Sequence, residues 1–193
     1  MHTVRRLAPT AALVASLLSS LGAAAADRYQ VDPVHTFVLF RVQHLGLSYS
    51  YGRFTQVDGT FSVDEGDLAK SAVELTIRAD SIATQDAKRD AHLNSPDFFN
   101  SKAFPVIRFV GKRFARGADG HLQVTGDLTL HGVTREITLP MDHVGEGKDP
   151  WGGYRSGYEG RVSLKRTDYG MDFMVGPVGE TVELILAVEG IRQ

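Results

Sequence analysis

The most distinctive polar cluster in the sequence is Arg89-Asp90-x-His92, which lies in a short segment of helical character. On a helix, Arg89 and His92 are neighbours three residues apart, whereas Asp90 points elsewhere. Together with His44, these side chains could recognise an anionic or hydroxyl group at the mouth of a cavity. They could instead form a strut that ties the helix to the rest of the protein, with Asp90 bound to a cation or to backbone N–H groups. We favour the strut.

Other patterns typical of catalysis or metal binding are missing from the sequence. The histidines after residue 26 form no H-x-H or H-E-x-x-H pattern; they are His35, His44, His92, His121, His131 and His143. No serine lies in a G-x-S-x-G turn, and no glycine-rich loop follows a strand and opens a helix. The count of zero cysteines excludes disulfides, thiol nucleophiles and thiolate metal sites. These motifs therefore give no evidence of a catalytic residue, a metal or a cofactor.

The first 26 residues have the layout of a secretory signal peptide. Arg5 and Arg6 give a positive start, residues 11–21 are apolar, and Ala24-Ala25-Ala26 offers a cleavage site before Asp27. The apolar run is short for a membrane span, so we expect no stable membrane insertion. An exported protein without disulfides fits the bacterial periplasm best. Residues 27–193 then form one domain with 19 basic and 23 acidic residues, a balance that does not favour nucleic-acid binding.

Alternation of apolar and polar residues dominates the rest of the chain and predicts half-buried antiparallel strands. The strands are expected at about eight segments, namely 34–44, 53–63, 73–77, 104–114, 122–130, 133–141, 153–165 and 182–188. Gly59 marks a bulge or bend within the second segment. One stretch differs, because residues 86–93 predict a short helix. Ser95-Pro96 then predicts a second helix start, with Ser95 as its N-cap.

Eight antiparallel strands can close into an up-and-down barrel or form a two-sheet sandwich, and we favour the barrel because closure removes exposed sheet edges. The interior of such a barrel is either filled by side chains or holds one small ligand. The inward phenylalanines therefore either fill a core or line a tube for an apolar ligand. Phe98 and Phe99, which lie in the helical insertion, could plug or gate one end.

The motifs along the chain resemble those of the YceI-like family. The resemblance begins with Asp32-x-x-His35-Thr36, Phe40-x-Val42-x-His44-Leu45-Gly46 and Gly52-x-Phe54. It continues through Arg89-Asp90-x-His92-Leu93-x-Ser95-x-Asp97-Phe98-Phe99 and Phe104-Pro105-x-Ile107-x-Phe109. The most specific block is Gly126-x-Leu128-Thr129-Leu130-His131-Gly132-Val133-Thr134-Arg135, and Arg166-Thr167-Asp168-Tyr169-Gly170-Met171 follows. The match spans Tyr29 to Glu189.

This resemblance implies an all-β fold, an eight-stranded antiparallel lipocalin-like barrel with a short helical insertion, over residues 27–193. It also implies a non-catalytic function, the carriage or sequestration of a polyisoprenoid lipid with a polyprenyl phosphate or quinone-type tail. The bound isoprenoid lipid would lie in an apolar tunnel. The expected ligand-binding residues are the apolar ones that face inward: Val38, Phe40, Val42, Phe54, Phe61, Leu75, Ile77, Phe98, Phe99, Ile107, Phe109, Leu128, Leu130, Ile137, Leu139, Val162, Leu184 and Leu186.

Two other functions are open at the level of the sequence. One is an enzyme that acts on an isoprenoid head group through Arg89, Asp90, His92 and His44. The other is a module that presents a quinone to a membrane redox partner such as a cytochrome. A homodimer is also open, because apolar residues exposed at a barrel mouth can pair with a second copy.

Overall fold

The computed structural model describes residues 26–193, so the predicted signal peptide lies outside the described residues except for Ala26. The strands are β1 (Tyr29–Val31), β2 (Phe37–His44), β3 (Ser48–Phe54), β4 (Val57–Ser62), β5 (Ala72–Arg78), β6 (Ile82–Ala83), β7 (Val106–Arg116), β8 (Leu122–Leu130), β9 (Val133–Lys148), β10 (Tyr154–Lys165) and β11 (Val178–Arg192). The helices are α1 (Ala87–Leu93) and the short 3-10 helices η1 (Leu68–Lys70), η2 (Ala79–Ser81) and η3 (Arg166–Tyr169). None of the helices within residues 26–193 has the length and apolarity needed to cross a membrane.

All strands pair antiparallel in one sheet that closes on itself. Along one side, β11 pairs first with β2 and then with β1, so β1 and β2 occupy one strand position. In the same way β3 and β4 share the next position, and β5 and β6 the one after. Together with β7 to β11, these positions make a closed barrel of 8 strands with one short helix. The predicted fold is therefore confirmed.

The predicted strand at 53–63 is broken in the structure, because β3 ends at Phe54 and β4 begins at Val57. The backbone N–H groups between them donate to Ser81 instead of to a neighbouring strand. Thr55 N lies 3.0 Å from Ser81 O, and Gln56 N lies 3.1 Å from Ser81 Oγ. Because Ser81 is buried, its oxygen atoms replace the ladder partners that these N–H groups lack.

Gly59 does not mark the predicted bulge, because the pairing of β4 with β5 continues in register through it. Its backbone has a φ of 148°, and a Cβ atom there would lie 2.1 Å from the carbonyl oxygen of Glu74. Glycine is therefore required by a close approach of two strands rather than by an inserted residue.

Helix α1 confirms the helix predicted at 86–93. Asp86 is its N-cap, with Oδ1 accepting a hydrogen bond from Arg89 N at 2.9 Å. The second helix predicted at Ser95-Pro96 is wrong, because the chain forms consecutive turns there. The carbonyl oxygen of Ser95 accepts from both Phe98 N and Asn100 N, and Asn100 takes a left-handed φ of 44°. A left-handed residue at this point stops a helix from forming.

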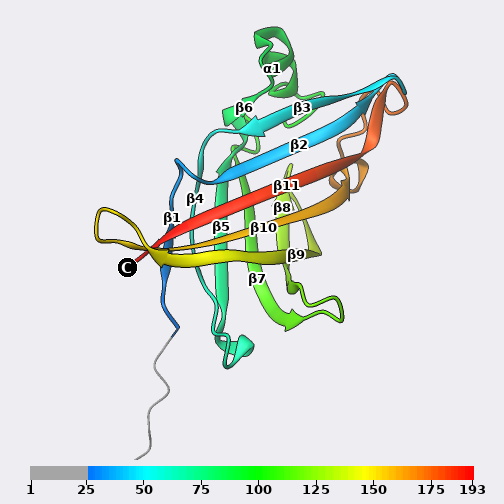
Figure 1. The fold of residues 1–193 in the computed structure, drawn as a ribbon. Coiled ribbons are helices and arrows are strands. Elements are labelled where there is room, and N and C mark those ends of the chain that lie inside the picture. The colour runs from blue at the N-terminus through cyan, green and yellow to red at the C-terminus, as the bar shows by residue number, and fades with distance from the viewer. Residues whose placement is uncertain (1–25) are drawn as a thin grey trace, which may run out of the picture.

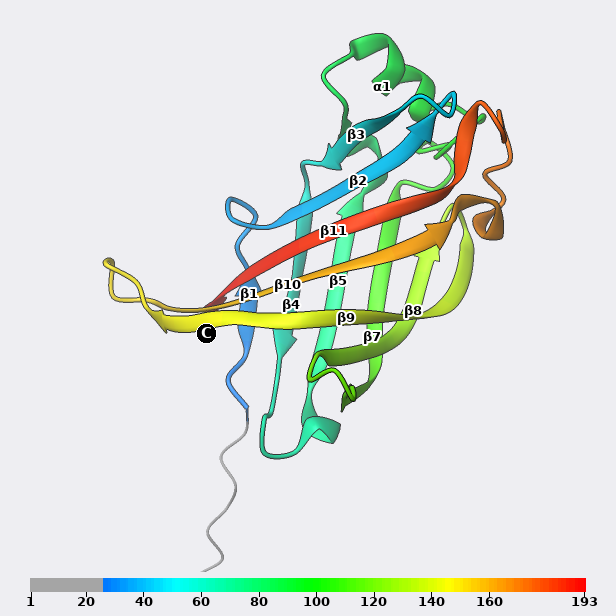
Figure 2. The same cartoon turned by 45° about the vertical axis from the view of Figure 1, so that its right-hand side comes forward.

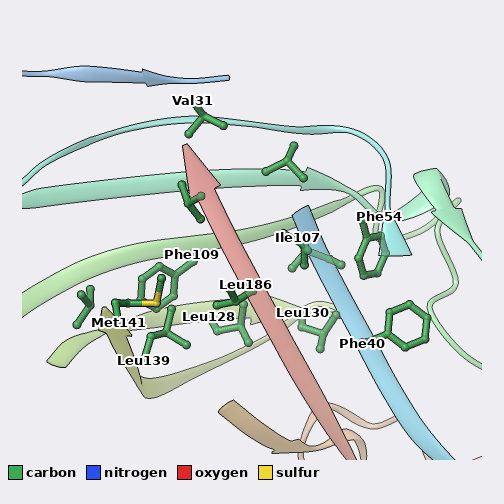
Figure 3. Close-up of a cluster of buried hydrophobic side chains, with 14 of the residues drawn as sticks. Val31, Phe40, Phe54, Ile107, Phe109, Leu128, Leu130, Leu139, Met141 and Leu186 are labelled. Atoms are coloured by element: carbon green, nitrogen blue, oxygen red, sulfur yellow. The ribbon is translucent and has the colours of Figure 1, made fainter. Parts of the chain in front are cut away.

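The barrel is flattened, and its two walls cross at a steep angle. Strands β2, β11, β10 and β9 run across strands β4, β5, β7 and β8 in both views (Figures 1 and 2). Helix α1 stands at one end of the barrel, next to β6. Apolar side chains from both walls point into the space between them, including Phe40, Phe109 and Leu128 (Figure 3).

Candidate functional site: an apolar cavity inside the barrel

An apolar cavity of about 150 Å³ occupies the barrel interior. Its wall comes from strands on both sides of the barrel, and Phe98 and Phe99 of the helical insertion close one end. A second cavity of about 60 Å³ continues away from the insertion, towards Phe61 and Leu122. The two cavities share the wall residues Leu75, Phe109, Leu139, Leu186 and Val188. The interior therefore offers an elongated apolar space along the barrel rather than a compact pocket.

Most of the residues predicted to bind a ligand lie on the wall of the larger cavity. The larger cavity is lined by Val38, Phe40, Val42, Phe54, Leu75, Ile77, Phe98, Phe99, Ile107, Phe109, Leu128, Leu130, Ile137, Leu139, Leu184 and Leu186. Phe61 lines the smaller cavity. Val162 packs against the core but lines neither cavity. The contact of these residues with a ligand stays a prediction.

Sequence reasoning missed eight residues of the larger wall: Leu93, Leu164, Arg166, Tyr169, Met171, Val178, Val182 and Val188. Strand alternation had already placed Leu164, Val182 and Val188 on the inward side, so that signal was available. Arg166, Tyr169 and Met171 follow no strand period, because they belong to the 3-10 helix η3 and the residues after it. Their place in the wall depends on how that helix turns back over the barrel end.

Arg166 is a buried cation in this otherwise apolar wall, and its donors are taken up by backbone carbonyls. Its Nε donates to Gly179 O at 2.9 Å, and its Nη1 donates to Met171 O at 2.6 Å and to Phe173 O at 2.8 Å. Its Nη2 donates to Val178 O at 3.0 Å. Desolvation by burial lowers the pKa of Arg166 from its usual value. The guanidinium therefore fastens the loop from 171 to 179 over the barrel end.

Tyr169 packs beside Arg166 with its hydroxyl buried and without a hydrogen-bond partner among the described residues. Burial raises the pKa of its phenol, so the group is neutral at physiological pH. The backbone carbonyl of Tyr169 accepts a hydrogen bond from His131 Nδ1 at 2.9 Å. Because a carbonyl can only accept, His131 Nδ1 is the donor. His131 thus holds η3 in place through Nδ1.

The cluster Arg89, Asp90, His92 and His44 does not converge into one site. Arg89 Nε donates to Thr84 Oγ1 at 2.8 Å, and Asp90 Oδ1 accepts from Thr84 N at 2.8 Å. His92 Nε2 pairs instead with Asp97 Oδ2 at 2.8 Å, and His44 is exposed at the end of β2. Asp90 therefore does not point away from Arg89, as the helical spacing suggested. Both side chains form hydrogen bonds with Thr84. These bonds connect α1 to the residue after β6, in agreement with the favoured interpretation as a strut.

A separate ionic cluster closes the barrel at the end opposite α1. Arg155 Nη1 lies 2.5 Å from Asp32 Oδ2 and 2.6 Å from Glu189 Oε1, and its Nε lies 2.9 Å from Asp149 Oδ2. His35 Nδ1 donates to Asp32 Oδ2 at 2.8 Å. Hydrogen bonds from Arg155 and His35 hold the pKa of the Asp32 carboxyl well below its usual value. Within residues 26–193, Asp32, His35 and Glu189 are close enough to share a cation, and the guanidinium already supplies that charge.

The closed barrel and its apolar interior place this protein in the class of small lipocalin-like β-barrels. The chain belongs to the YceI-like family, whose domain matches residues 29–190. It is 44% identical to the protein YceI of Escherichia coli O157:H7 over 181 residues, which cover 93% of this chain and 94% of that relative.

Two solved structures share the fold at low sequence identity. BcnA of Burkholderia cenocepacia superposes with a TM-score of 0.75 at 20% identity, over 82% of this chain and 98% of that one. A polyisoprenoid-binding domain from Saccharophagus degradans superposes with a TM-score of 0.65 at 17% identity, over 86% of this chain and 98% of that one. At these identities the likeness is one of fold.

Proposed function

We propose that this protein binds a polyisoprenoid lipid inside its barrel and carries or sequesters that lipid in the periplasm, without catalysing a reaction on it. The observation that carries the proposal is the pair of adjoining apolar cavities along the barrel interior. A structure of the same fold from Saccharophagus degradans is described as a polyisoprenoid-binding domain, which supports this class of ligand.

The shape and chemistry of the interior suit a long apolar chain. An isoprenoid chain carries no polar atoms along its length, so burial and dispersion alone can hold it. The wall of the larger cavity consists of aliphatic and aromatic side chains except for Arg166, and Arg166 and Tyr169 lie at its α1 end. A head group, either a phosphate or a quinone ring, would therefore lie towards that end, with the chain extending towards Phe61.

The free energy also favours an occupied interior. At about 24 cal/mol per Å³, leaving a cavity of about 150 Å³ empty costs about 3–4 kcal/mol of folding free energy. Each five-carbon isoprene unit that leaves water for this interior gains about 4 kcal/mol, at about 0.8 kcal/mol per buried methylene. A few such units offset the cost of immobilising the chain, so the barrel can hold a lipid that is poorly soluble in water.

The enzymatic alternative needed Arg89, Asp90, His92 and His44 to meet at the mouth of the cavity. Arg89 and Asp90 instead hold Thr84, His92 pairs with Asp97, and His44 is exposed at the end of β2, so these four described residues do not meet at the cavity. The alternative of a module that presents a quinone to a membrane cytochrome shares the same ligand and differs only in the partner.

The test is to identify the ligand and then to rebind it. The exported protein, without its predicted signal peptide, is purified from the periplasm of its bacterial host, extracted with organic solvent and analysed by mass spectrometry. The delipidated protein is then titrated with a fluorescent farnesyl probe, with a straight-chain acyl probe as the matched comparison. We expect a prenyl lipid in the extract and tighter binding of the farnesyl probe. An extract without lipid, together with no binding of either probe, would refute the proposal.

A further inference from the structure

Two loops at the α1 end of the barrel expose a group of apolar side chains, which we call the apolar tip. It consists of Leu45 and Leu47 in the turn between β2 and β3, and Phe173, Met174 and Val175 in the loop before β11. Leu47 is 84% exposed, and the other members are between 40% and 54% exposed. These two loops lie side by side in both views (Figures 1 and 2), and Leu45 N donates to Pro177 O at 2.7 Å.

The apolar tip is continuous with the wall of the cavity. The ring of Phe173 packs edge-on against the ring of Phe98, with centroids 5.5 Å apart, and Phe98 lines the cavity. The residues that flank the loop, Met171 and Val178, line the cavity as well. An apolar path therefore runs from the outer surface of the tip, across the contact of Phe173 with Phe98, into the barrel.

Each of the two loops contains an exposed apolar residue whose backbone takes a left-handed φ angle. Leu45 and Met174 take left-handed φ angles of 54° and 52°. Such angles are uncommon for residues other than glycine and are costly for bulky side chains. In both loops a glycine follows within two residues, Gly46 and Gly176, where an added Cβ atom would meet no neighbour within 4 Å.

The tip carries almost no charge. Residues 43–49 contain no acidic or basic side chain other than His44, and residues 170–179 contain a single one, Asp172. Beyond the tip, Tyr49 and Tyr51 are exposed on β3, and the guanidinium of Arg41 lies 4.6 Å from the ring centroid of Tyr49. An uncharged apolar tip bordered by tyrosines matches the profile of the membrane–water interface, where aromatic side chains lie at the level of the head groups.

We propose that the apolar tip docks reversibly on the surface of a lipid bilayer and thereby brings the α1 end of the cavity to the membrane. This inference rests on the proposed function, because a lipid carrier must reach the membrane that holds its ligand. The docking is driven by apolar burial rather than by anionic lipids, since the tip has no basic cluster to attract them. The barrel itself stays outside the hydrocarbon, and only the two loops enter the interface.

Trp151, the single tryptophan of the chain, makes the test possible. It is 81% exposed in the hairpin before β10, whereas the tip lies beyond the other end of the same strand. Strand β10 has 12 residues, so the two ends are about 40 Å apart at about 3.3 Å per residue. The native protein therefore reports on one end, and the double variant Leu47→Trp/Trp151→Phe reports on the other.

Both proteins are mixed with phosphatidylcholine vesicles that contain brominated acyl chains, which quench a tryptophan in the interface. We expect a blue shift and quenching for Leu47→Trp/Trp151→Phe and no change for the native Trp151. The effect is expected to be the same at low and high salt, and with or without phosphatidylglycerol. Quenching of Trp151 alone, quenching of neither protein, or binding that salt or anionic lipid controls would each overturn the proposal.

A second pair of variants separates docking from ligand binding. Leu47→Asp/Val175→Asp is expected to lower vesicle binding at least tenfold, whereas the matched control Val144→Asp/Trp151→Asp changes exposed apolar residues at the far end and leaves it unaltered. Both should bind the farnesyl probe in solution as the native protein does. If the native protein fails to bind that probe, the proposed function fails; if the probe binds and the tip variant still docks on vesicles, only this inference fails. A native dimer that the tip variant dissociates would assign the tip to a second copy instead and overturn the proposal.

Discussion

Opposite changes at Leu128 should separate the role of the cavity in ligand binding from its role in stability. Leu128 is buried on β8, and it lies on the wall of the larger cavity among the side chains shown in Figure 3. Leu128→Trp adds about six non-hydrogen atoms, roughly the size of one isoprene unit, into a space of about 150 Å³. Displacing one unit costs about 4 kcal/mol of binding, which raises the Kd about a thousandfold. Leu128→Ala enlarges the same space.

Leu128→Trp should be the more stable of the two variants, and Leu128→Ala should bind the ligand more tightly. In urea unfolding of the delipidated proteins, Leu128→Ala is expected to lose about 2–5 kcal/mol because it creates a larger empty cavity. Leu128→Trp should lose less, because part of the new ring fills space that is already empty. In titrations with the fluorescent farnesyl probe, Leu128→Trp should lose binding while Leu128→Ala keeps a Kd within about tenfold of the native value. A folded Leu128→Trp protein with native affinity would show that the ligand lies elsewhere.

Three further predictions concern the framework around the cavity. Arg155 holds the pKa of Asp32 below its usual value, so the stabilisation from Asp32 is complete above about pH 4 and is lost as the pH falls further. Asp32→Asn should therefore lower the urea midpoint at pH 7. The midpoint of this variant should also depend less on pH in the acid range than that of the native protein. Gly126→Ala should lower the free energy of unfolding by about 2–3 kcal/mol, since its Cβ atom would lie 2.2 Å from Val110 O, and a midpoint equal to that of the native protein would contradict this packing. Arg166→Met leaves four backbone carbonyls without their donor and should speed amide hydrogen exchange in residues 171–179, with unchanged exchange counting against the assigned role.

The strands could be predicted because each of them has one face towards solvent and one face towards the barrel interior. In β8, every second residue from Leu122 to Leu130 is buried, and the sequence alternates in the same way. The break at Thr55 and Gln56 could not be predicted, because its cause is Ser81, a residue 25 positions away along the chain that supplies the missing partners. The alternation of apolar and polar residues shows which side chains of a strand face inward. A break in a strand depends on side chains that are distant in the sequence.

The residues of the candidate site likewise include some that the sequence pattern predicts and some that it does not. The wall residues contributed by strands follow from the period of two, so Phe40 and Leu184 were placed correctly. The contributions of Arg166 and Tyr169 depend on a 3-10 helix with no periodic signal of its own. The strut was the favoured interpretation of Asp90, but its partner Thr84 lies on the other side of a turn and has no local signature.

The ionic cluster at Arg155 explains how a barrel without disulfides stays closed around an interior that is partly empty. Closure depends on β1, which pairs with β11 through only three residues and with β4 through two. Directly after β1, Asp32 N donates to Glu189 O at 2.8 Å, and Arg155 on β10 binds the side chains of both residues. Two strands are thus fastened to a third where the ladder between β1 and β11 has only three pairs. Because a cavity weakens the packing that would otherwise hold the walls together, the ion pairs of Arg155 support the barrel where the pairing of β1 is short.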